Sequence, residues 1–290
     1  MANTISKKDW DILVSRVESQ ECTPFLGAGA SAEVLPVGAQ LSRDLAEKYH
    51  YPFSDVEDLV RVSQFIAVYY DQMYPKDQVL RRFSQVKPPD FRGPDEPHAF
   101  FARLQLPVYM TTNYDDFLTQ ALKRSHRDPH QETCRWNSLL KGRPSLFDPP
   151  SGYVPTPANP LVYHLHGYGS SESLVLTEDD YLEFLENLSK EPDLLPEPVK
   201  EALKKPSLLF VGYRVTDWNL RVLLRLLRPS LQTLSVVVLK PPDPDGPDQK
   251  RVQDYLERYY GSMHMRVYWG TARKFCAEFQ KRLKAAGVSI

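Results

Sequence analysis

Short apolar runs alternate along this chain with longer segments in which apolar residues recur every three to four positions. The short runs are typical of strands buried in a sheet, and the periodic segments are typical of amphipathic helices. The expected strands are 23–26, 107–110, 161–165, 174–176, 208–211, 234–239 and 265–268. Strands that alternate with helices predict an α/β fold, here a Rossmann-like, doubly wound and mostly parallel sheet.

Helical spacing is most extensive between the first two expected strands. The helices predicted there are 41–49, 56–70 and 78–86, and a proline-rich loop follows over 86–97. We therefore expect a helical insertion of about residues 37–106 after the first strand–helix turn, within a single domain of residues 1–290. The other predicted helices are 6–20, one that begins after Thr177, 216–227, 252–260 and one that includes 275–283.

Ligands of such sheets bind at the carboxyl ends of the strands, and polar or glycine-rich clusters follow several of the strands expected here. The first is Gly27-Ala28-Gly29-Ala30-Ser31. Two glycines allow the backbone to approach a diphosphate, whose oxygens the free N–H groups and the Ser31 hydroxyl could bind. The alternative is a tight turn without a ligand, because a full dinucleotide fingerprint requires a third glycine.

The second cluster is Thr112-Asn113-Tyr114-Asp115, directly after the strand at 107–110. Asn113 could offer an amide to a sugar hydroxyl or a water molecule, and Asp115 could offer a carboxylate. The alternative is that both side chains only form a turn or cap the next helix.

The third cluster contains His164 and His166, which lie two apart on a strand and so face the same side. Either both histidines line one pocket, or His164 is a core histidine and only His166 reaches the cleft, which we favour. No third ligand stands at a metal-site spacing, so we expect no metal.

The fourth cluster begins at Gly212, which ends a buried strand, and continues to Asp217 and Asn219. It is a second place where a backbone turn could hold a nucleotide. Asp217 could equally be a simple helix cap.

Composition limits the classes of protein that fit. With 36 basic and 37 acidic residues the net charge is -1, so we expect no direct nucleic-acid binding. The three cysteines form no CxxC pair and cannot build a four-cysteine zinc site or a disulfide framework. Such sparse cysteines suit the cytoplasm. No apolar run approaches the ~18 residues that span a bilayer, and we expect no signal peptide.

In this order, GAGAS, TTNYD, HLHG and FVGYRVTDWN resemble the motifs of sirtuin-like NAD-consuming domains, most closely the sirtuin-like NAD hydrolases of bacterial anti-phage defence. The resemblance extends over about residues 22–272. It implies that Asn113 and His166 are catalytic and that Asp115 shapes the nicotinamide pocket. The other residues that it implies in NAD binding are Gly27, Ala28, Gly29, Ser31, Thr112, Gly212, Asp217 and Asn219.

The resemblance implies an NAD glycohydrolase that releases nicotinamide and ADP-ribose and acts as the toxic effector of abortive infection. NAD is then the substrate. A toxic activity requires an off state, and the resemblance implies control by homo-oligomerisation or by a partner such as a DNA-translocating ATPase or an Argonaute-type sensor.

Two rival functions stay open at this point. A protein deacylase is disfavoured, because the zinc-ribbon cysteines are missing and residues 33–38 lack the Phe and Arg of the deacylase motif. The other rival is a regulatory or scaffold subunit that binds NAD or ADP-ribose without catalysis. An ordinary dehydrogenase is less favoured, because the glycine fingerprint is incomplete.

Overall fold

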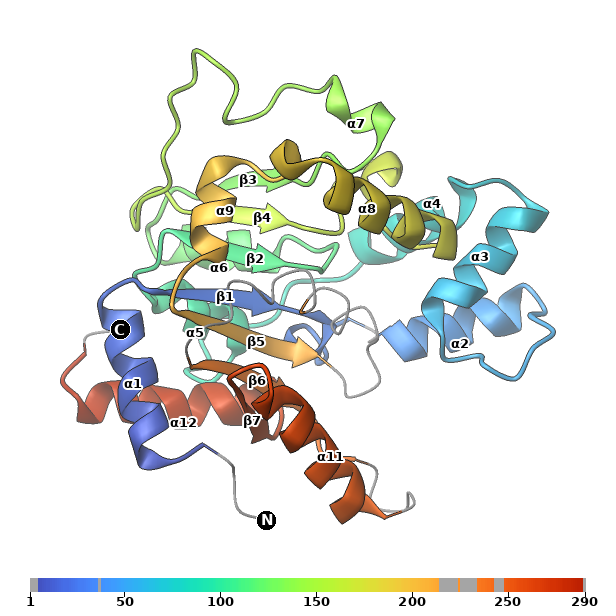
Figure 1. The fold of residues 1–290 in the computed structure, drawn as a ribbon. Helices are drawn as coiled ribbons and strands as arrows, with labels where there is room; N and C mark the ends of the chain where they lie inside the picture. Colours follow the sequence, from blue (N-terminus) through green and yellow to red (C-terminus); the bar gives the residue numbers. More distant parts are fainter. Residues whose placement is uncertain (1–4, 36–37, 214–223, 225–233, 243–247, 289–290) are drawn as a thin grey trace.

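The computed structural model describes residues 5–35, 38–213, 224, 234–242 and 248–288 (Figure 1). Within these residues, seven strands form one parallel sheet in the order β3-β4-β2-β1-β5-β6-β7. The strands are β1 (Cys22–Leu26), β2 (Val108–Thr111), β3 (His130–Thr133), β4 (Leu161–His164), β5 (Ser207–Tyr213), β6 (Ser235–Leu239) and β7 (Met265–Trp269). The predicted Rossmann-like α/β fold is confirmed.

The side of the sheet on which the chain adds strands changes at β1, the central strand. The chain first builds β2, β3 and β4 on one side of β1 and then crosses to β5 on the other side. In parallel sheets such a reversal opens a crevice at the carboxyl ends of the strands. Leu26 is in register with Val211, and the N–H of Gly27 donates to the carbonyl of Val211 at 2.8 Å. The turn after β1 therefore starts beside the carboxyl end of β5.

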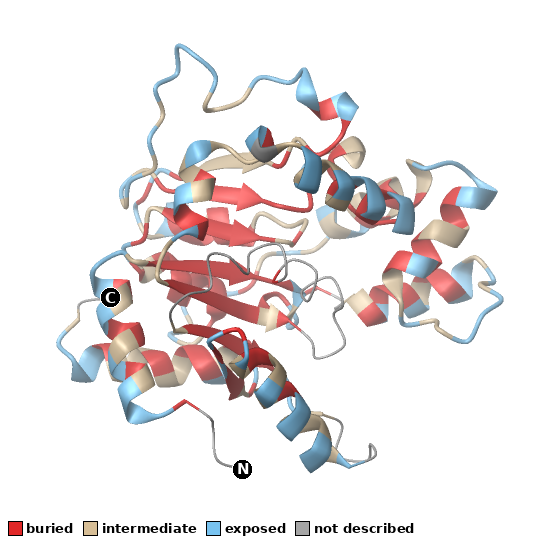
Figure 2. Ribbon diagram, in the orientation of Figure 1, coloured by how far each residue is buried: buried red, intermediate tan, exposed pale blue. Residues whose placement is uncertain are grey.

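Helices cover both faces of the sheet, and the central strands between them are buried (Figure 2). One face packs against α1 (Lys7–Glu18), α5 (Pro97–Arg103), α6 (Phe117–Arg124) and α12 (Ala272–Ala285). The other packs against α8 (Glu178–Lys190), α9 (Glu197–Leu203) and α11 (Gln249–Gly261). Leu26 points into the first core and Phe25 into the second, as the two-residue period of a strand requires. Burial on both faces explains the continuous apolar runs.

Three helices between β1 and β2 have an apolar core of their own. They are α2 (Gly38–Lys48), α3 (Leu59–Tyr69) and α4 (Tyr74–Ser84). Leu41, Ile66 and Val79 pack there with Leu174 and Leu176, which precede α8. Figure 1 shows these helices beyond the arrowheads of the strands, so they face the carboxyl edge of the sheet. The remaining short helices of the described residues are η1 (Ala28–Ala30), α7 (Ser138–Lys141), η2 (Ser171–Ser173) and η3 (Pro192–Leu194).

A buried ion pair joins the inserted helices to the rest of the fold. The ammonium of Lys76 on α4 lies 2.6 Å from Oδ1 of Asp180 on α8, and both side chains are over 90% buried. The other carboxylate oxygen of Asp180 accepts the N–H groups of Leu176 and Thr177 at 3.0 and 2.8 Å. The ammonium also lies 5.6 Å from the ring centroid of Trp136. Both charges are thus compensated away from water, as buried charges must be.

Several expected elements differ from the structure. Residues 174–176 form no strand; they are an extended segment whose apolar side chains fill two cores, which is why the run looks like a strand. Strand β3 was not predicted, because His130–Thr133 is a half-buried polar edge strand. Helix α5 begins at Pro97, where the sequence predicted a loop. The predicted helix at 216–227 lies almost entirely outside the described residues. Among the residues described, no helix is long and apolar enough to cross a membrane.

Candidate active site

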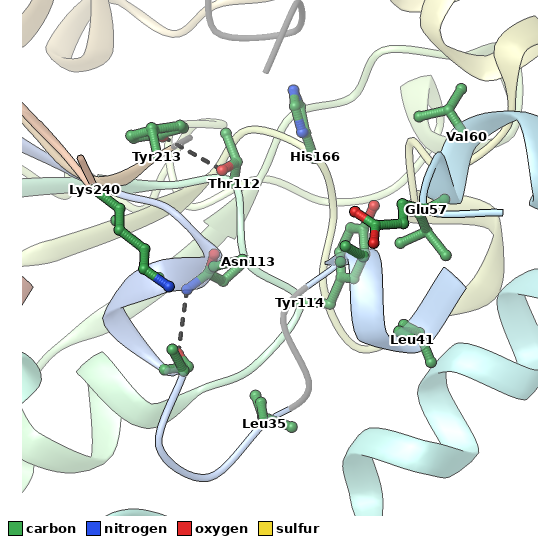
Figure 3. A pocket seen from close by; sticks show the side chains of 18 of the residues that line it. Leu35, Leu41, Glu57, Val60, Thr112, Asn113, Tyr114, His166, Tyr213 and Lys240 are labelled. Atoms are coloured by element: carbon green, nitrogen blue, oxygen red, sulfur yellow. Dashed lines mark hydrogen bonds between the residues drawn. The ribbon is translucent and has the colours of Figure 1, made fainter. Parts of the chain in front are cut away.

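A cavity of about 880 Å³ lies at the carboxyl ends of the central strands (Figure 3). Its sheet side is formed by the turns after β1 and β2 and by the carboxyl ends of β5 and β6, and includes Gly29, Asn113 and Gly212. Leu41 and Val60 of the inserted helices form the opposite wall. This volume is within the range that small-molecule sites occupy. The insertion is therefore part of the pocket itself.

The glycine turn after β1 presents free backbone donors to this cavity. The N–H groups of Ala30 and Ser31 are bonded within the turn, at 2.9 and 3.1 Å from the carbonyls of Gly27 and Ala28. The N–H groups of Ala28 and Gly29 have no acceptor among the described residues, as is normal at the start of a helix. Such donors suit an anionic ligand.

Gly212, at the end of β5, packs directly on the glycine turn. Its φ of +89° belongs to the region that side chains rarely adopt. A Cβ on Gly212 would lie 2.5 Å from the nitrogen of Ala30, and one on Gly29 would lie 2.9 Å from the Cα of Gly212. The glycine turn and the end of β5, which belong to two separate clusters in the sequence, thus form one surface, and glycine is needed on both sides of it.

Ser31 is the centre of a hydrogen-bond network beneath the turn. Its hydroxyl lies 3.0 Å from Oδ2 of Asp115 and 3.3 Å from Nδ2 of Asn113. The Asn113 amide also donates to the carbonyl of Gly27 at 3.2 Å. Burial raises the pKa of the Asp115 carboxyl, an effect that nearby His98 and the Ser31 hydroxyl oppose. The three side chains, which the sequence placed after two different strands, are in contact.

Sequence reasoning missed two buried members of this network, His98 and Glu96. Nε2 of His98 lies 3.3 Å from the Ser31 hydroxyl, and Nδ1 lies 2.7 Å from Oε1 of Glu96. Glu96 also caps α5 by accepting the N–H groups of His98 and Ala99. The sequence does contain a signal for this helix start, because Glu96 is followed by Pro97, and an acidic residue before a proline is typical of the beginning of a helix.

The two histidines of the third cluster lie in different surroundings. His164 is 1% exposed, its Nδ1 lies 3.3 Å from the carbonyl of Asn113, and its ring stacks on Tyr168. His166 lines the cavity, and its Nδ1 lies 3.4 Å from the hydroxyl of Tyr181. This is the second of the two arrangements considered above. Burial lowers the pKa of His164 to about 4 and that of His166 to about 3, so both rings are neutral at pH 7.

These lowered values predict that acid weakens the fold. Because both pKa values fall on folding from an ordinary 6.5, the histidines' contribution to stability is complete above pH 6.5. It is lost as the pH falls toward 4 and 3, at up to about 1.4 kcal/mol per pH unit for each histidine. Urea unfolding between pH 7.5 and 5 measures this slope. His166→Asn is expected to flatten it, and an unchanged slope would contradict the assignment.

The remaining predicted residues have mixed outcomes. Thr112 lines the cavity, and its hydroxyl lies 3.3 Å from that of Tyr213, which belongs to the fourth cluster. Asp217 and Asn219 lie outside the described residues.

No metal site is apparent in the described part of the chain, where no three or more His, Cys, Asp or Glu side chains are grouped to hold an ion. The three cysteines are free and buried. Burial raises the pKa of Cys22 and of Cys134 to about 12, so these thiols are protonated and poor nucleophiles.

Comparison with known proteins agrees with this geometry. The family model described as SIR2-like domain matches residues 107–263, more than half of the chain. The chain belongs to the SIR2-like domain family. The matched segment of this SIR2-like chain contains Asn113, His166 and Gly212, whereas the glycine turn precedes it. The family expected from the sequence motifs is thereby confirmed.

Three curated relatives are each named NAD(+) hydrolase ThsA. The Enterococcus faecium protein is 25% identical over 76% of this chain, the Acinetobacter baumannii (strain 532279) protein 24% over 75%, and the Bacillus cereus (strain MSX-D12) protein 29% over 74%. The matches cover 43, 41 and 42% of these relatives, so the SIR2-like chain spans less than half of their length. A solved chain described under "Structural Basis for the Mechanism and Regulation of Sir2 Enzymes" superposes with a TM-score of 0.45 at 13% identity, over 97% of this chain and 99% of that one.

Proposed function

We propose that this SIR2-like chain hydrolyses NAD at the nicotinamide–ribose bond and releases nicotinamide and ADP-ribose. The observation that carries the proposal is the convergence of Ser31, Asn113 and Asp115 beneath a glycine turn, in the same cavity as His166. The curated relatives named NAD(+) hydrolase support the same substrate.

The glycine turn would bind the diphosphate of NAD. Ala28 and Gly29 line the cavity, and their N–H groups have no acceptor among the described residues. Asn113 lies directly beyond the turn, held by Gly27 and Ser31. Its carboxamide oxygen is then available to a ribose hydroxyl or to the attacking water.

The reaction breaks the bond between C1′ of the ribose and the nicotinamide nitrogen. The electron pair of that bond stays with nicotinamide, which leaves as a neutral molecule, and the ribose becomes oxocarbenium-like. Water adds to C1′ and its proton passes to Nε2 of His166, in the tautomer whose Nδ1–H faces Tyr181. A bound diphosphate raises the pKa of a nearby imidazole and so strengthens this base. Positioning of NAD and electrostatic stabilisation of the transition state supply most of the rate enhancement.

A role as the toxic effector of abortive infection is part of the same proposal, and it rests on the motif resemblance. It includes an off state, imposed by homo-oligomerisation or by a partner such as a DNA-translocating ATPase or an Argonaute-type sensor. We propose a cytoplasmic location because the three scattered cysteines suit a reducing compartment.

Product analysis separates this proposal from its rivals. The purified chain is incubated with NAD, with and without an acetylated peptide, and the nucleotides are resolved by chromatography. We expect nicotinamide and ADP-ribose in equal amounts without peptide. Binding of NAD without nicotinamide release, even with an activating partner present, would instead support a binding module. Acetyl-ADP-ribose formed only with peptide would support a deacylase.

A further inference from the structure

Lys240 is a charged side chain of the cavity that the proposed hydrolysis does not use. It directly follows β6 and lines the pocket. Among the described lining residues it is the one lysine or arginine. It is exposed, and no hydrogen bond or ion pair joins it to another residue that the structure describes. A lysine ammonium of this kind is a point charge with three donors available to a ligand.

The carboxylates of the outer wall lie on the opposite side of the cavity from Lys240, as Glu57 in Figure 3 illustrates. Most of these carboxylates have cationic partners. Asp55 lies 2.7 Å from Arg61, and Glu57 is paired with Arg43. Among the described residues, Lys240 is thus a cation of the cavity without a paired carboxylate, and an anionic ligand group would be stabilised beside it.

The sheet order places this charge relative to the glycine turn. β5 lies between β1 and β6, so the end of β6 is two strand spacings, about 10 Å, from the turn after β1. A dinucleotide with its diphosphate on that turn can extend its adenosine ribose over β5 toward Lys240. In dinucleotide sites a carboxylate at this ribose binds the 2′-hydroxyl, whereas a basic side chain accommodates a 2′-phosphate. Here the residue that follows β6 is basic.

We propose that Lys240 binds a phosphate group of the dinucleotide, an inference that rests on the proposed function of the site. Two phosphates have the required chemistry, the diphosphate and a 2′-phosphate on the adenosine ribose. In the second case the substrates of the site include NADP. Lys240 thus determines which dinucleotides bind, according to the phosphate groups that they have. Asn113 and His166 act on the glycosidic bond.

The test uses two ligands that lack the scissile bond, ADP-ribose and ADP-ribose 2′-phosphate. Their binding to the purified chain, to Lys240→Gln and to Lys281→Gln is measured by calorimetry. Lys281 is an exposed lysine on α12 outside the cavity, so it controls for loss of surface charge. We expect Lys240→Gln to weaken binding by about tenfold or more, as loss of a charge-assisted hydrogen bond does.

The two ligands distinguish the two phosphates. A loss confined to ADP-ribose 2′-phosphate identifies the 2′-phosphate and predicts turnover of NADP, whereas an equal loss for both identifies the diphosphate. If Lys240→Gln binds both ligands as tightly as the parent and Lys281→Gln do, the inference is wrong and the proposed hydrolysis stands. If the parent binds neither ligand, the dinucleotide site itself is wrong and both proposals fail.

Discussion

Replacement of His166 by asparagine is expected to lower kcat for nicotinamide release from NAD about 100- to 10,000-fold, the usual contribution of a general base. His166 lines the cavity, is 7% exposed and is neutral at pH 7, so its imidazole can accept the proton of the attacking water. KM should change little, because the glycine turn and not the imidazole binds the diphosphate. Initial rates over a range of NAD concentrations separate the two constants.

His126→Asn is the matched control for this variant. His126 is exposed and has a φ of 58°, a conformation that asparagine tolerates well. The His126→Asn variant should have the same kcat as the parent. A kcat for His166→Asn within about twofold of the parent would remove His166 from the proton transfer.

The second large effect is expected on stability. Lys76→Met should lower the free energy of unfolding by about 3–5 kcal/mol, because it leaves the carboxylate of Asp180 charged and buried. The loss should be largest near the insertion, since this ion pair joins α4 to α8. Urea unfolding measures the global effect, and amide hydrogen exchange in α2–α4 measures the local one.

Two comparisons isolate the buried charge. Lys190→Met removes the exposed pair with Glu186 and should cost less than about 1 kcal/mol. Adding Asp180→Asn to Lys76→Met should recover part of the loss, because asparagine can still accept the N–H groups of Leu176 and Thr177. If Lys76→Met costs no more than Lys190→Met, the ion pair does not hold the insertion.

Much of the sheet was predictable because its strands are buried on both faces. Ser235–Leu239, for example, is a nearly continuous apolar run of five buried residues, which is typical of a central parallel strand. β3 was not predictable in this way, since its four side chains are half-buried and polar. Residues 174–176 mislead in the opposite sense, because their burial comes from two helical cores and not from a sheet.

The site was predictable where it follows the strand ends. Parallel strands bring their carboxyl ends to one edge, so Ser31, Asn113 and Asp115 could be expected together. His98 could not be found by this rule, because it reaches Ser31 from a helix 67 positions along the chain. Lys240 does follow a strand, but a single lysine has no motif, and only the shape of the cavity distinguishes it.

The most direct test of the account is the rate at which the purified chain releases nicotinamide from NAD, measured beside Asn113→Ala and Asn159→Ala. Asn159 is not among the residues that line the cavity, and its side-chain amide donates to Asp128. We predict equal rates for the parent and Asn159→Ala, and a rate at least about 100-fold lower for Asn113→Ala. Equal rates in all three proteins, under conditions in which the parent releases nicotinamide, would contradict the role of Asn113.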